Sequence, residues 1–511
     1  MTTTLGELLP YAARHYGDRT ALIVGGKTFN YRELDDLSNS VANALMAAKV
    51  RPGDRVTLDG PNCWEWLVAY YGIAKVGAVL NPINEMLTQE EVRFVIEDTG
   101  ARAVIASREK GECLLDLKGR TDLSEVILWG EPLVPGALSL DSCFREGKSH
   151  FNVVPRRTDD LASICYTSGT TGYPKGAVHD HRAAMRAIIG TALMAARTSN
   201  DRFVNALPLA HVYGSCVFNA TFMCGGCLIM LPRFDETAIL HAISEHKATM
   251  LDGVPTIYYY LLGHKNFEKY DLSSLNRCWV GGQTLPVAKS LEFAERVGCP
   301  VHEVWGMTEL AGPASANPAI GLSKAGTIGF AFPGNEMRIV DAHDPKIVLS
   351  PGRRGELMFR GPMVMKGYYG NGQATTEALE SDGWLHTGDI ATVDEDGYFT
   401  IVDRKKDMIL TAGFNIYPAE LERVLCMHPA VALAAVAGVP DEAKGELAKA
   451  YVVRKRDAHV TKHSLVQHCR EHLAAYKVPR AVQFVEDVPK TSTGKVMRRG
   501  LIDIDDGTRS L

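Results

Sequence analysis

The stretch with the clearest potential for chemistry is residues 166–176, which read Y-T-S-G-T-T-G-Y-P-K-G. Its glycines let successive backbone N–H groups turn towards an anion, the hydroxyls of Thr167, Ser168, Thr170 and Thr171 reach phosphate oxygens, and Lys175 supplies positive charge. A flexible Gly/Ser/Thr linker is the alternative. The linker is disfavoured because the stretch leaves a strand-like run, 161–165, and precedes a helix-like one, 181–197. The sequence therefore predicts a loop that cradles a polyphosphate.

This loop is not a Walker A loop. The Walker pattern, G-x-x-x-x-G-K-[ST], places a hydroxyl ligand for magnesium directly after its lysine. Here Pro174 precedes Lys175 and Gly176 follows it. The residues that assist at the phosphates must therefore come from elsewhere in the chain.

The composition describes an ordinary globular protein. Its 511 residues predict about two to four structural units, and 46% apolar and 23% charged residues exclude a disordered or fibrous chain. A net charge of −5 gives no reason to expect a nucleic acid or an anionic membrane as partner. No secretory signal is visible, the apolar run 216–231 is too interrupted and short to span a bilayer, and the 11 cysteines are scattered. We therefore expect a cytoplasmic protein without a transmembrane segment.

The order of the predicted elements indicates an α/β fold. Helical periodicity at 5–16 and 34–48 alternates with strand-like runs at 20–24 and 55–58, which is typical of parallel sheets covered by helices. From about residue 324, short strands separated by turns predict antiparallel strands or a small β-barrel-like part. After the charged run 403–407 a compact α+β pattern resumes, with helices expected at 418–427 and 462–475 and strands at 432–437, 449–453 and 481–485. We expect a large N-terminal domain over 1–404 and a small mobile C-terminal domain over 405–511, with a hinge about 404–406.

Five further motifs accompany the loop, and together they carry a family resemblance. They are L-P-L-A-H-V-Y-G at 207–214, V-W-G-M-T-E at 304–309, G-W-L-H-T-G-D at 383–389, D-R-K-K-D-M-I-L-T-A-G-F-N-I-Y-P at 403–418, and P-K-T-S-T-G-K at 489–495. In this order, and over nearly the whole chain, they resemble the adenylate-forming superfamily of acyl-CoA synthetases, luciferases and peptide-synthetase adenylation domains. Y-P-A-E-L-E at 417–422 and Y-K-V-P at 476–479 look most like fatty-acyl- and aryl-CoA ligases.

The resemblance implies an AMP-forming acid–CoA ligase that uses ATP, Mg²⁺ and coenzyme A. AMP transfer to a carboxylate creates a good leaving group, but the step brings two anions together and needs cations and oriented donors. Lys495, Thr308, Glu309 and His211 would be catalytic, with Glu309 holding the metal. ATP or AMP would contact Thr167, Ser168, Gly169, Thr170, Thr171, Gly172, Lys175, Gly281, Gly282, Gln283, Trp305, Gly306, Thr308, Asp389, Arg404 and Lys495. Trp305 departs from the tyrosine that the family usually has, and an indole can also stack on adenine.

The resemblance also implies a second step, made possible by a rotation of the C-terminal domain about Lys406. The rotation would withdraw Lys495 and bring Gly413, Phe414 and Asn415 to a tunnel for the pantetheine arm of CoA. Lys477 and Arg480 are candidates for the CoA phosphates. The rival acceptors within the superfamily are oxygen, as in luciferase, and a carrier-protein thiol. A non-catalytic scaffold is disfavoured because it would have no chemical use for the full set of motifs.

The acid is predicted only by class. The stretches expected to line the acyl pocket, 207–226 and 304–316, contain no lysine or arginine to pair a second carboxylate. We therefore expect an apolar monocarboxylic acid, fatty or aromatic, in contact with His211, Tyr213, Val217, Met223, Met307 and Leu310. A zinc or redox role for the C-x₂-C pair Cys224/Cys227 is disfavoured, as is a metal site at His468 and His472. Small-molecule acid, ATP and CoA are the expected partners, and a homodimer is left open.

Overall fold

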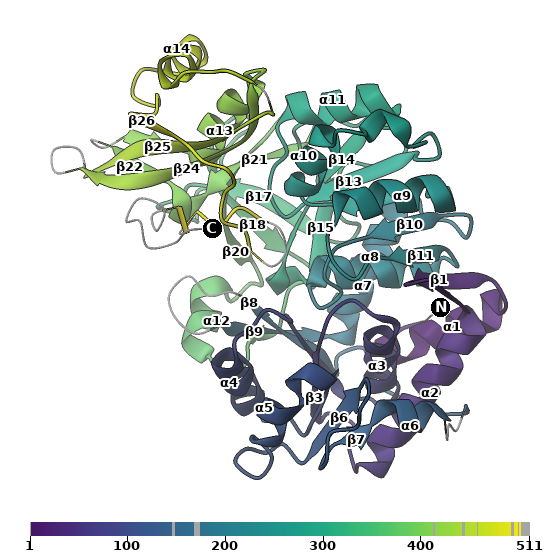
Figure 1. The fold of residues 1–511 in the computed structure, drawn as a ribbon. Coiled ribbons are helices and arrows are strands. Elements are labelled where there is room, and N and C mark those ends of the chain that lie inside the picture. The colour runs from purple at the N-terminus through teal and green to yellow at the C-terminus, as the bar shows by residue number, and fades with distance from the viewer. Residues whose placement is uncertain are drawn as a thin grey trace.

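The computed structural model describes residues 2–145, 149–167, 174–411, 414–441, 445–456, 458–491, 495–498 and 500–501. Within these residues the strands form four sheets, and helices cover the two largest (Figure 1). This arrangement confirms the predicted α/β class with a large N-terminal part and a smaller C-terminal part.

The first large sheet has the strand order β19-β9-β8-β4-β3-β5-β6-β7. Strands β3 to β8 run parallel to one another, whereas β9 pairs antiparallel with both β8 and β19. The predicted phosphate loop connects the antiparallel strands β8 and β9. The strands are β3 (Arg55–Asp59), β4 (Val79–Ile83), β5 (Ala103–Ser107), β6 (Glu125–Trp129), β7 (Leu138–Ser139), β8 (Leu161–Thr167), β9 (Lys175–Asp180) and β19 (Gly367–Tyr368).

The second large sheet has the order β16-β15-β14-β13-β12-β10-β11-β1-β2. It is parallel from β1 to β14 and antiparallel at both edges. Its strands are β1 (Thr20–Val24), β2 (Lys27–Asn30), β10 (Arg202–Asn205), β11 (Cys227–Met230), β12 (Met250–Gly253), β13 (Arg277–Gly281), β14 (Val301–Met307), β15 (Gly312–Ala316) and β16 (Phe330–Ala331).

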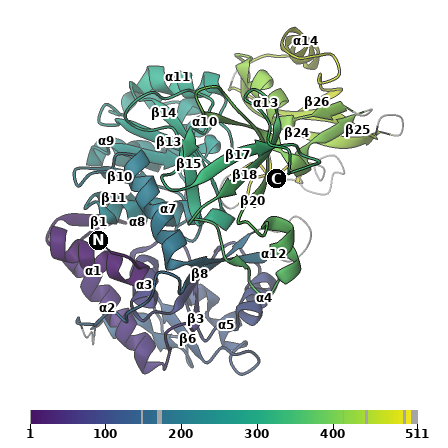
Figure 2. The same cartoon turned by 180° about the vertical axis from the view of Figure 1, so that it is seen from behind.

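A layer of five helices packs between these sheets, as Figure 2 shows from behind. Helix α3 (Trp64–Lys75) is buried along nearly its whole length, which explains why it is apolar on every side. Helix α2 (Tyr31–Ala47) begins with a capping box in which Asn30 and Glu33 bond to each other's backbone N–H. The other three are α1 (Leu5–Tyr16), α7 (His181–Met194) and α8 (Val212–Met223).

Shorter helices cover the outer faces of the sheets. They are α4 (Gln89–Thr99), α5 (Gly111–Leu115), α6 (Leu140–Arg145), α9 (Glu236–His246), α10 (Pro255–Gly263), α11 (Val287–Val297) and α12 (Gly372–Ala378). Four short 3₁₀ turns are described as well: η1 (Arg108–Lys110), η2 (Phe267–Lys269), η3 (Thr308–Leu310) and η4 (Lys405–Asp407). No helix in the described part of the chain combines the length and apolar character of a membrane span.

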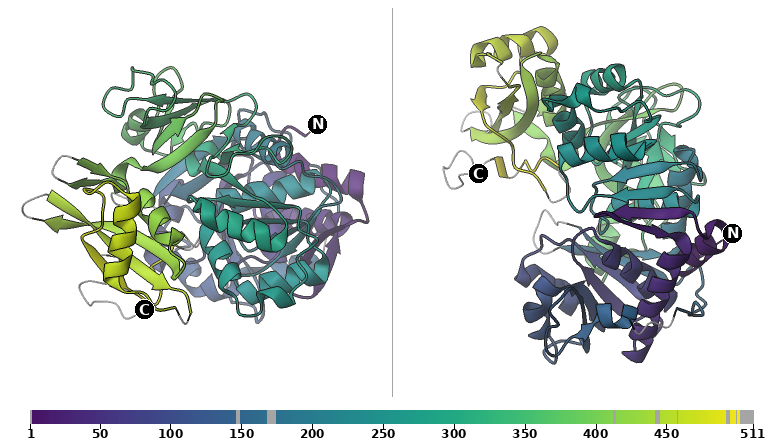
Figure 3. Two further views of the ribbon diagram at one scale, coloured as in Figure 1. Left: turned by 90° about the horizontal axis from the view of Figure 1, so that it is seen from above. Right: turned by 45° about the vertical axis from the view of Figure 1, so that its right-hand side comes forward.

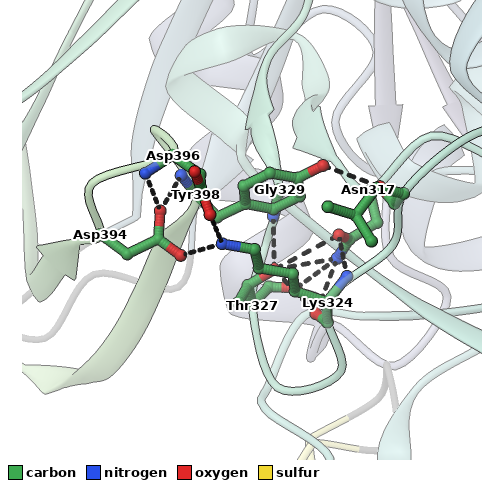
Figure 4. Close-up of polar contacts among 8 residues, drawn as sticks. Asn317, Lys324, Thr327, Gly329, Asp394, Asp396 and Tyr398 are labelled. Carbon is green, nitrogen blue, oxygen red and sulfur yellow. Dashed lines mark hydrogen bonds and ion pairs between the residues drawn. The ribbon is translucent and has the colours of Figure 1, made fainter.

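The third sheet is antiparallel, with the order β17-β18-β20-β21. Its strands are β17 (Glu336–Val340), β18 (Gly355–Arg360), β20 (Leu385–Val393) and β21 (Phe399–Arg404). The turn between β20 and β21 is tied to the segment after β15, because Lys324 Nζ lies 2.5 Å from Asp394 Oδ2 and 2.6 Å from Asp396 Oδ2 (Figure 4). The Tyr398 hydroxyl donates to the Leu322 carbonyl at 2.7 Å and strengthens the same junction.

The C-terminal part has its own apolar core, formed by strands β22 to β26 and two helices. It lies at one side of the molecule, away from the N-terminus (Figure 3), and contacts α10 and α11 of the large part. Its elements are β22 (Ile409–Thr411), β23 (Phe414–Ile416), α13 (Pro418–Met427), β24 (Val431–Asp441), β25 (Gly445–Arg454), α14 (Lys462–His472) and β26 (Ala481–Phe484). Helix α13 has the expected bounds, whereas β24 and β25 extend beyond the expected strands.

Candidate active site

Asp389 is the centre of a fully paired polar cluster. The β20–β21 register places Asp389 opposite Arg404, and Arg404 Nε lies 2.8 Å from Asp389 Oδ1. The indole N–H of Trp305 donates to the other carboxylate oxygen at 2.7 Å. Only 3% of Asp389 is exposed. The two donors together hold its buried carboxylate in one orientation. The three residues, predicted from separate motifs, thus lie together.

The indole explains how the chain accommodates Trp305. Its ring is buried and lies with its centroid 6.2 Å from that of Phe359, while its N–H orients Asp389. The adjacent Gly306 is required by space, since a Cβ at this position would lie 2.1 Å from the Gly312 carbonyl oxygen. The V-W-G segment is therefore a tightly packed support for the carboxylate.

Glu309 and Lys175 meet at one tyrosine. Glu309 lies in η3 and is buried, and the Tyr368 hydroxyl donates to its Oε1 at 2.7 Å. Lys175 Nζ lies 5.3 Å from the centroid of the Tyr368 ring, in cation–π range. The carboxylate is a hard oxygen ligand of the kind that Mg²⁺ takes, so Glu309 fits a metal beside the phosphate loop. The predicted residues Ser168 to Gly172 of that loop lie outside the described residues, while Thr167 and Lys175 are paired across β8 and β9.

A buried histidine supports Thr308. His179 Nε2 lies 2.7 Å from the Thr308 carbonyl oxygen, which can only accept, so His179 carries its proton on Nε2. Its Nδ1 then accepts from the Ser163 hydroxyl at 3.0 Å. Burial lowers the pKa of His179 to about 4, so the ring is neutral. Sequence reasoning missed His179, Ser163 and Tyr368, and the one available signal was a histidine inside a buried strand.

Lys495 reaches this centre from the C-terminal part. It packs so closely on Gly282 that a Cβ there would lie 2.4 Å from Lys495 Cε. Burial first, and then the charge of Arg404, lower the pKa of Lys495 to about 8, although Asp389 opposes the shift. The Gln283 side chain holds the neighbouring backbone, because Oε1 accepts from Val496 N at 3.0 Å and Nε2 donates to Val496 O at 3.3 Å. Gly282 and Gln283 thus position the lysine.

His211 begins helix α8 next to Lys495. Its Nδ1 accepts from the Tyr213 backbone N–H at 3.2 Å, so the side chain acts as the helix cap. Burial, and then the positive charge of Lys495, lower the pKa of His211 to about 3. A neutral imidazole at this place can bond to a substrate but does not carry charge near neutral pH.

Asp403 connects the large part to the C-terminal part. Its Oδ2 accepts from the Ala419 N–H at 2.7 Å, in the first turn of α13, and its Oδ1 accepts from Arg498 Nη1 at 3.2 Å. Arg498 also lies 2.8 Å from Asp407 Oδ2 and 2.8 Å from Glu422 Oε2. Burial raises the pKa of Asp403 to about 6 against the opposing effect of Arg498. These contacts bridge η4, the short turn that contains the predicted hinge residue Lys406.

The residues predicted to bind CoA all lie on the C-terminal part. Gly413 lies outside the described residues, and Phe414 and Asn415 are exposed on β23. Phe414 contacts Tyr476, with ring centroids 4.9 Å apart. Lys477 Nζ lies 2.7 and 2.8 Å from the two oxygens of Glu420, which neutralises its charge here. Arg480 is exposed.

A small cavity lies beside Tyr213. Of the six residues predicted for the acyl pocket, Tyr213 and Val217 line this cavity, while His211, Met223, Met307 and Leu310 do not. Val304 and Phe332 add apolar walls. Arg197 and Asp252 also line it, 2.7 Å apart as a buried ion pair, and sequence reasoning missed both because they lie outside the two stretches considered.

The Cys224/Cys227 pair and the His468/His472 pair do not change which residues form the candidate active site. Cys224 and Cys227 are free thiols. In the described ranges, the only cluster of three side chains able to share an ion is His468, Glu471 and His472 on α14, which does not include these cysteines.

Comparison with known proteins agrees with this geometry. The model of the AMP-binding enzyme family matches residues 9–369, and that of the AMP-binding enzyme C-terminal domain matches residues 420–495. The chain belongs to the AMP-binding enzyme family. The predicted phosphate loop lies within the first matched range, Asp389 lies between the two ranges, and Lys495 is the last residue of the second.

Relatives of this AMP-binding enzyme span nearly its whole length. A long-chain-fatty-acid–CoA ligase of Salmonella typhimurium is 35% identical, over 98% of this chain and 94% of the relative. A Mycobacterium tuberculosis ligase, named for a methyl-dioxo-octahydroindenyl-propanoyl CoA ester, is 36% identical over 98% and 99%. The crystal structure of the anthranilate CoA ligase AuaEII with anthranoyl-AMP superposes with a TM-score of 0.91 at 28% identity, covering 99% of each chain. The protein is thus an AMP-forming acid–thiol ligase.

Proposed function

We propose that this protein is a carboxylic acid–CoA ligase that first makes an acyl-adenylate from ATP and an apolar monocarboxylic acid and then forms the CoA thioester. One observation carries the proposal. Lys495, from the C-terminal part, lies on Gly282 in the electrostatic range of Asp389 and Arg404, from the large part. A buried cation brought to a carboxylate–arginine pair by a separate domain suits a phosphorus centre that gains negative charge in the transition state.

The nucleotide roles follow from the paired cluster. Asp389, oriented by Trp305 and Arg404, has acceptor capacity left for the ribose hydroxyls, since each carboxylate oxygen accepts more than one bond. Lys175 and the loop 167–172 would hold the phosphates that leave as pyrophosphate. A magnesium ion held by Glu309 would neutralise phosphate charge at the same place.

The thioester step needs a second arrangement of the C-terminal part. Domain limits of 1–404 and 405–511, with Lys406 as the hinge, remain our proposal. Rotation there would break the contacts of Asp403 with Ala419 and Arg498, withdraw Lys495, and present the 413–415 loop to the adenylate. Lys477 would have to leave Glu420 to bind a CoA phosphate, whereas Arg480 is exposed already.

The acid is proposed as apolar over most of its length. The walls at Tyr213, Val217, Val304 and Phe332 are buried or partly buried, and the one cation of the cavity, Arg197, is neutralised by Asp252. A dicarboxylate would find no uncompensated positive charge there. The relatives carry names for a fatty acid, a bicyclic diketo acid and an aromatic acid, so they support the reaction without fixing the acid.

A panel of carboxylic acids, scored by AMP release with and without CoA, tests the proposed function. We expect AMP release that depends on the acid and rises when CoA is added, because CoA clears the adenylate. AMP release that is indifferent to CoA would favour another acceptor, such as oxygen or a carrier-protein thiol. Preference for a short dicarboxylate over octanoate and benzoate would contradict the proposed acid class.

A further inference from the structure

The acid-side cavity contains an ion pair whose charges cancel. The side chains of Arg197 and Asp252 are 1% and 3% exposed, with Arg197 Nη2 2.7 Å from Asp252 Oδ2. The other oxygen of Asp252 accepts from the Tyr213 hydroxyl at 3.2 Å, and Arg197 Nη1 donates to Thr221 Oγ1 at 2.8 Å. The acceptors of this group are therefore engaged by protein donors.

Two donors on residues that line this cavity have no acceptor among the described residues. They are Arg197 Nε and Trp279 Nε1, both buried, on two residues that line the cavity. A buried donor without an acceptor costs about 1–3 kcal/mol. Two such donors at one small cavity are therefore unfavourable unless an acceptor enters it.

The size and charge of the cavity limit what can enter. Its volume is about 10 Å³, close to the space of one water molecule and too small for an alkyl group or a ring. Because the Arg197–Asp252 pair is neutral overall, a carboxylate would be buried there without a compensating charge. A single oxygen atom of a neutral carbonyl or ether satisfies both limits.

The cavity adjoins the site proposed for adenylation at Tyr213, which forms part of its wall. The Tyr213 ring lies 3.2 Å from the position that a Cβ of Gly281 would take, and Lys495 packs on the next residue, Gly282. Tyr213 therefore separates the catalytic lysine from the Arg197–Asp252 pair. An acid with its carboxylate near Lys495 and its chain along Tyr213 would point towards the Arg197–Asp252 pair.

We propose that the acid substrate carries a neutral hydrogen-bond acceptor, a keto or ether oxygen, at the end remote from its carboxylate, and that Arg197 Nε and Trp279 Nε1 bind this oxygen. This inference rests on the proposed CoA-ligase function and specifies its substrate class. Such a site rejects the unsubstituted acid because that acid leaves buried donors unpaired.

The test compares octanoate with keto-octanoates that carry the carbonyl at successive positions towards the methyl end, and with octanedioate. The readout is kcat/KM for acid-dependent pyrophosphate release, taken as the ratio of keto acid to octanoate. A ratio is independent of the fraction of active enzyme, so partial misfolding of a variant does not obscure it. We expect at least one keto-octanoate to exceed octanoate by about ten-fold or more in the wild-type enzyme.

Three variants assign the preference to the two donors. Trp279→Phe removes one donor and keeps an aromatic ring, and Arg197→Lys keeps the charge beside Asp252 but removes the guanidinium N–H. Each is expected to lower the ratio several-fold. Trp66→Phe is the matched control, because Trp66 also has a buried indole N–H without an acceptor in the described ranges but does not line the cavity. This control is expected to keep the wild-type ratio.

The outcomes separate the inference from the proposed function. Octanoate turnover with no keto acid above it in the wild-type enzyme would overturn the inference and leave the CoA-ligase function intact, as expected if the donors bind only water. Equal loss of the ratio in Trp66→Phe would also overturn it, as would preference for octanedioate. Failure of every acid to release pyrophosphate would overturn the proposed function, and the inference with it.

Discussion

The two ends of this active site differ in how completely their polar groups are paired. At the nucleotide end, both oxygens of Asp389 have a donor, and Glu309 is bonded by Tyr368. At the acid end, Arg197 Nε and Trp279 Nε1 have no acceptor in the described part of the protein. Groups that act on ATP in every turnover can be oriented in advance by the protein itself. Groups that distinguish one acid from another obtain their hydrogen-bond partner only when the acid binds.

The largest expected effect comes from removing the proposed catalytic cation, Lys495, at the nucleotide end. Lys495→Ala removes the charge that meets the transition state, so acid-dependent pyrophosphate release should fall about a hundred- to a thousand-fold. Transfer of a supplied acyl-adenylate to CoA should remain, because the proposed rotation withdraws Lys495 in that step. The two half-reactions are measured separately in stopped assays. Equal loss of both would refute the two arrangements of the C-terminal part.

A smaller effect is expected from the carboxylate that the cluster holds. Asp389→Asn removes the charge that pairs with Arg404, and the KM for ATP should rise about ten-fold or more, since hydrogen bonds to charged groups contribute about 1.5–3 kcal/mol. Asp394→Asn is the matched control in the same hairpin, because that carboxylate is paired with Lys324 at the exposed end of the sheet. A similar KM in both variants would contradict a role for Asp389 at the nucleotide.

The ion pairs of Arg498 link the two parts across the predicted hinge. Weakening them should lower activity less than loss of the catalytic groups does, and only in the adenylation half-reaction. Arg498→Lys cannot bond Asp403, Asp407 and Glu422 at once, so the arrangement that delivers Lys495 becomes less populated. We expect adenylation to fall about ten-fold while thioester formation from a supplied adenylate changes little. Arg360→Lys, in an exposed pair with Glu336, serves as the control. A drop in thioester formation as large as that in adenylation would show a general loss of structure instead.

The smallest expected effect is a pH dependence at the nucleotide end. Burial lowers the pKa of Lys495 from 10.5 to about 8, so the lysine loses its proton as the pH rises through about 8 in the free enzyme. The protonated form is the one that acts, and kcat/KM for ATP should therefore be about halved near pH 8 and decline further above it. Thioester formation from a supplied adenylate should lack this decline. A flat adenylation profile up to pH 10 would show that the charge of Lys495 is not needed.

The clustering of residues at the proposed nucleotide end could be predicted from sequence, and that at the proposed acid end could not, for a physical reason. Asp389, Trp305, Arg404 and Lys495 lie in short motifs, and the structure brings them together although they come from four separate segments. The partners that orient a motif are harder to find, because Tyr368 and His179 reach Glu309 and Thr308 from other strands. Arg197 and Asp252 meet only through the packing of α7 against the second sheet. No spacing in the sequence indicates that pair.

The fold likewise contains elements whose bounds the sequence predicts and elements whose bounds it does not. Helices α1 and α13 have the bounds that periodicity and Pro418 predict, because local pattern and capping fix them. The long hairpin of β24 and β25 exceeds the expected strands, since cross-strand pairing continues past the apolar positions that marked them. The prediction of an uncharged pocket considered two stretches only. The structure adds a charged pair to the pocket but also neutralises it.

The most direct test of the central claim is mass spectrometry of the enzyme's products from ATP and a turned-over acid, first without CoA and then after its addition. The account predicts that acyl-AMP and pyrophosphate form without CoA, and that added CoA converts this acyl-AMP to acyl-CoA and AMP. Formation of ADP and phosphate in place of AMP and pyrophosphate, or acyl-AMP that CoA does not consume, would contradict the account.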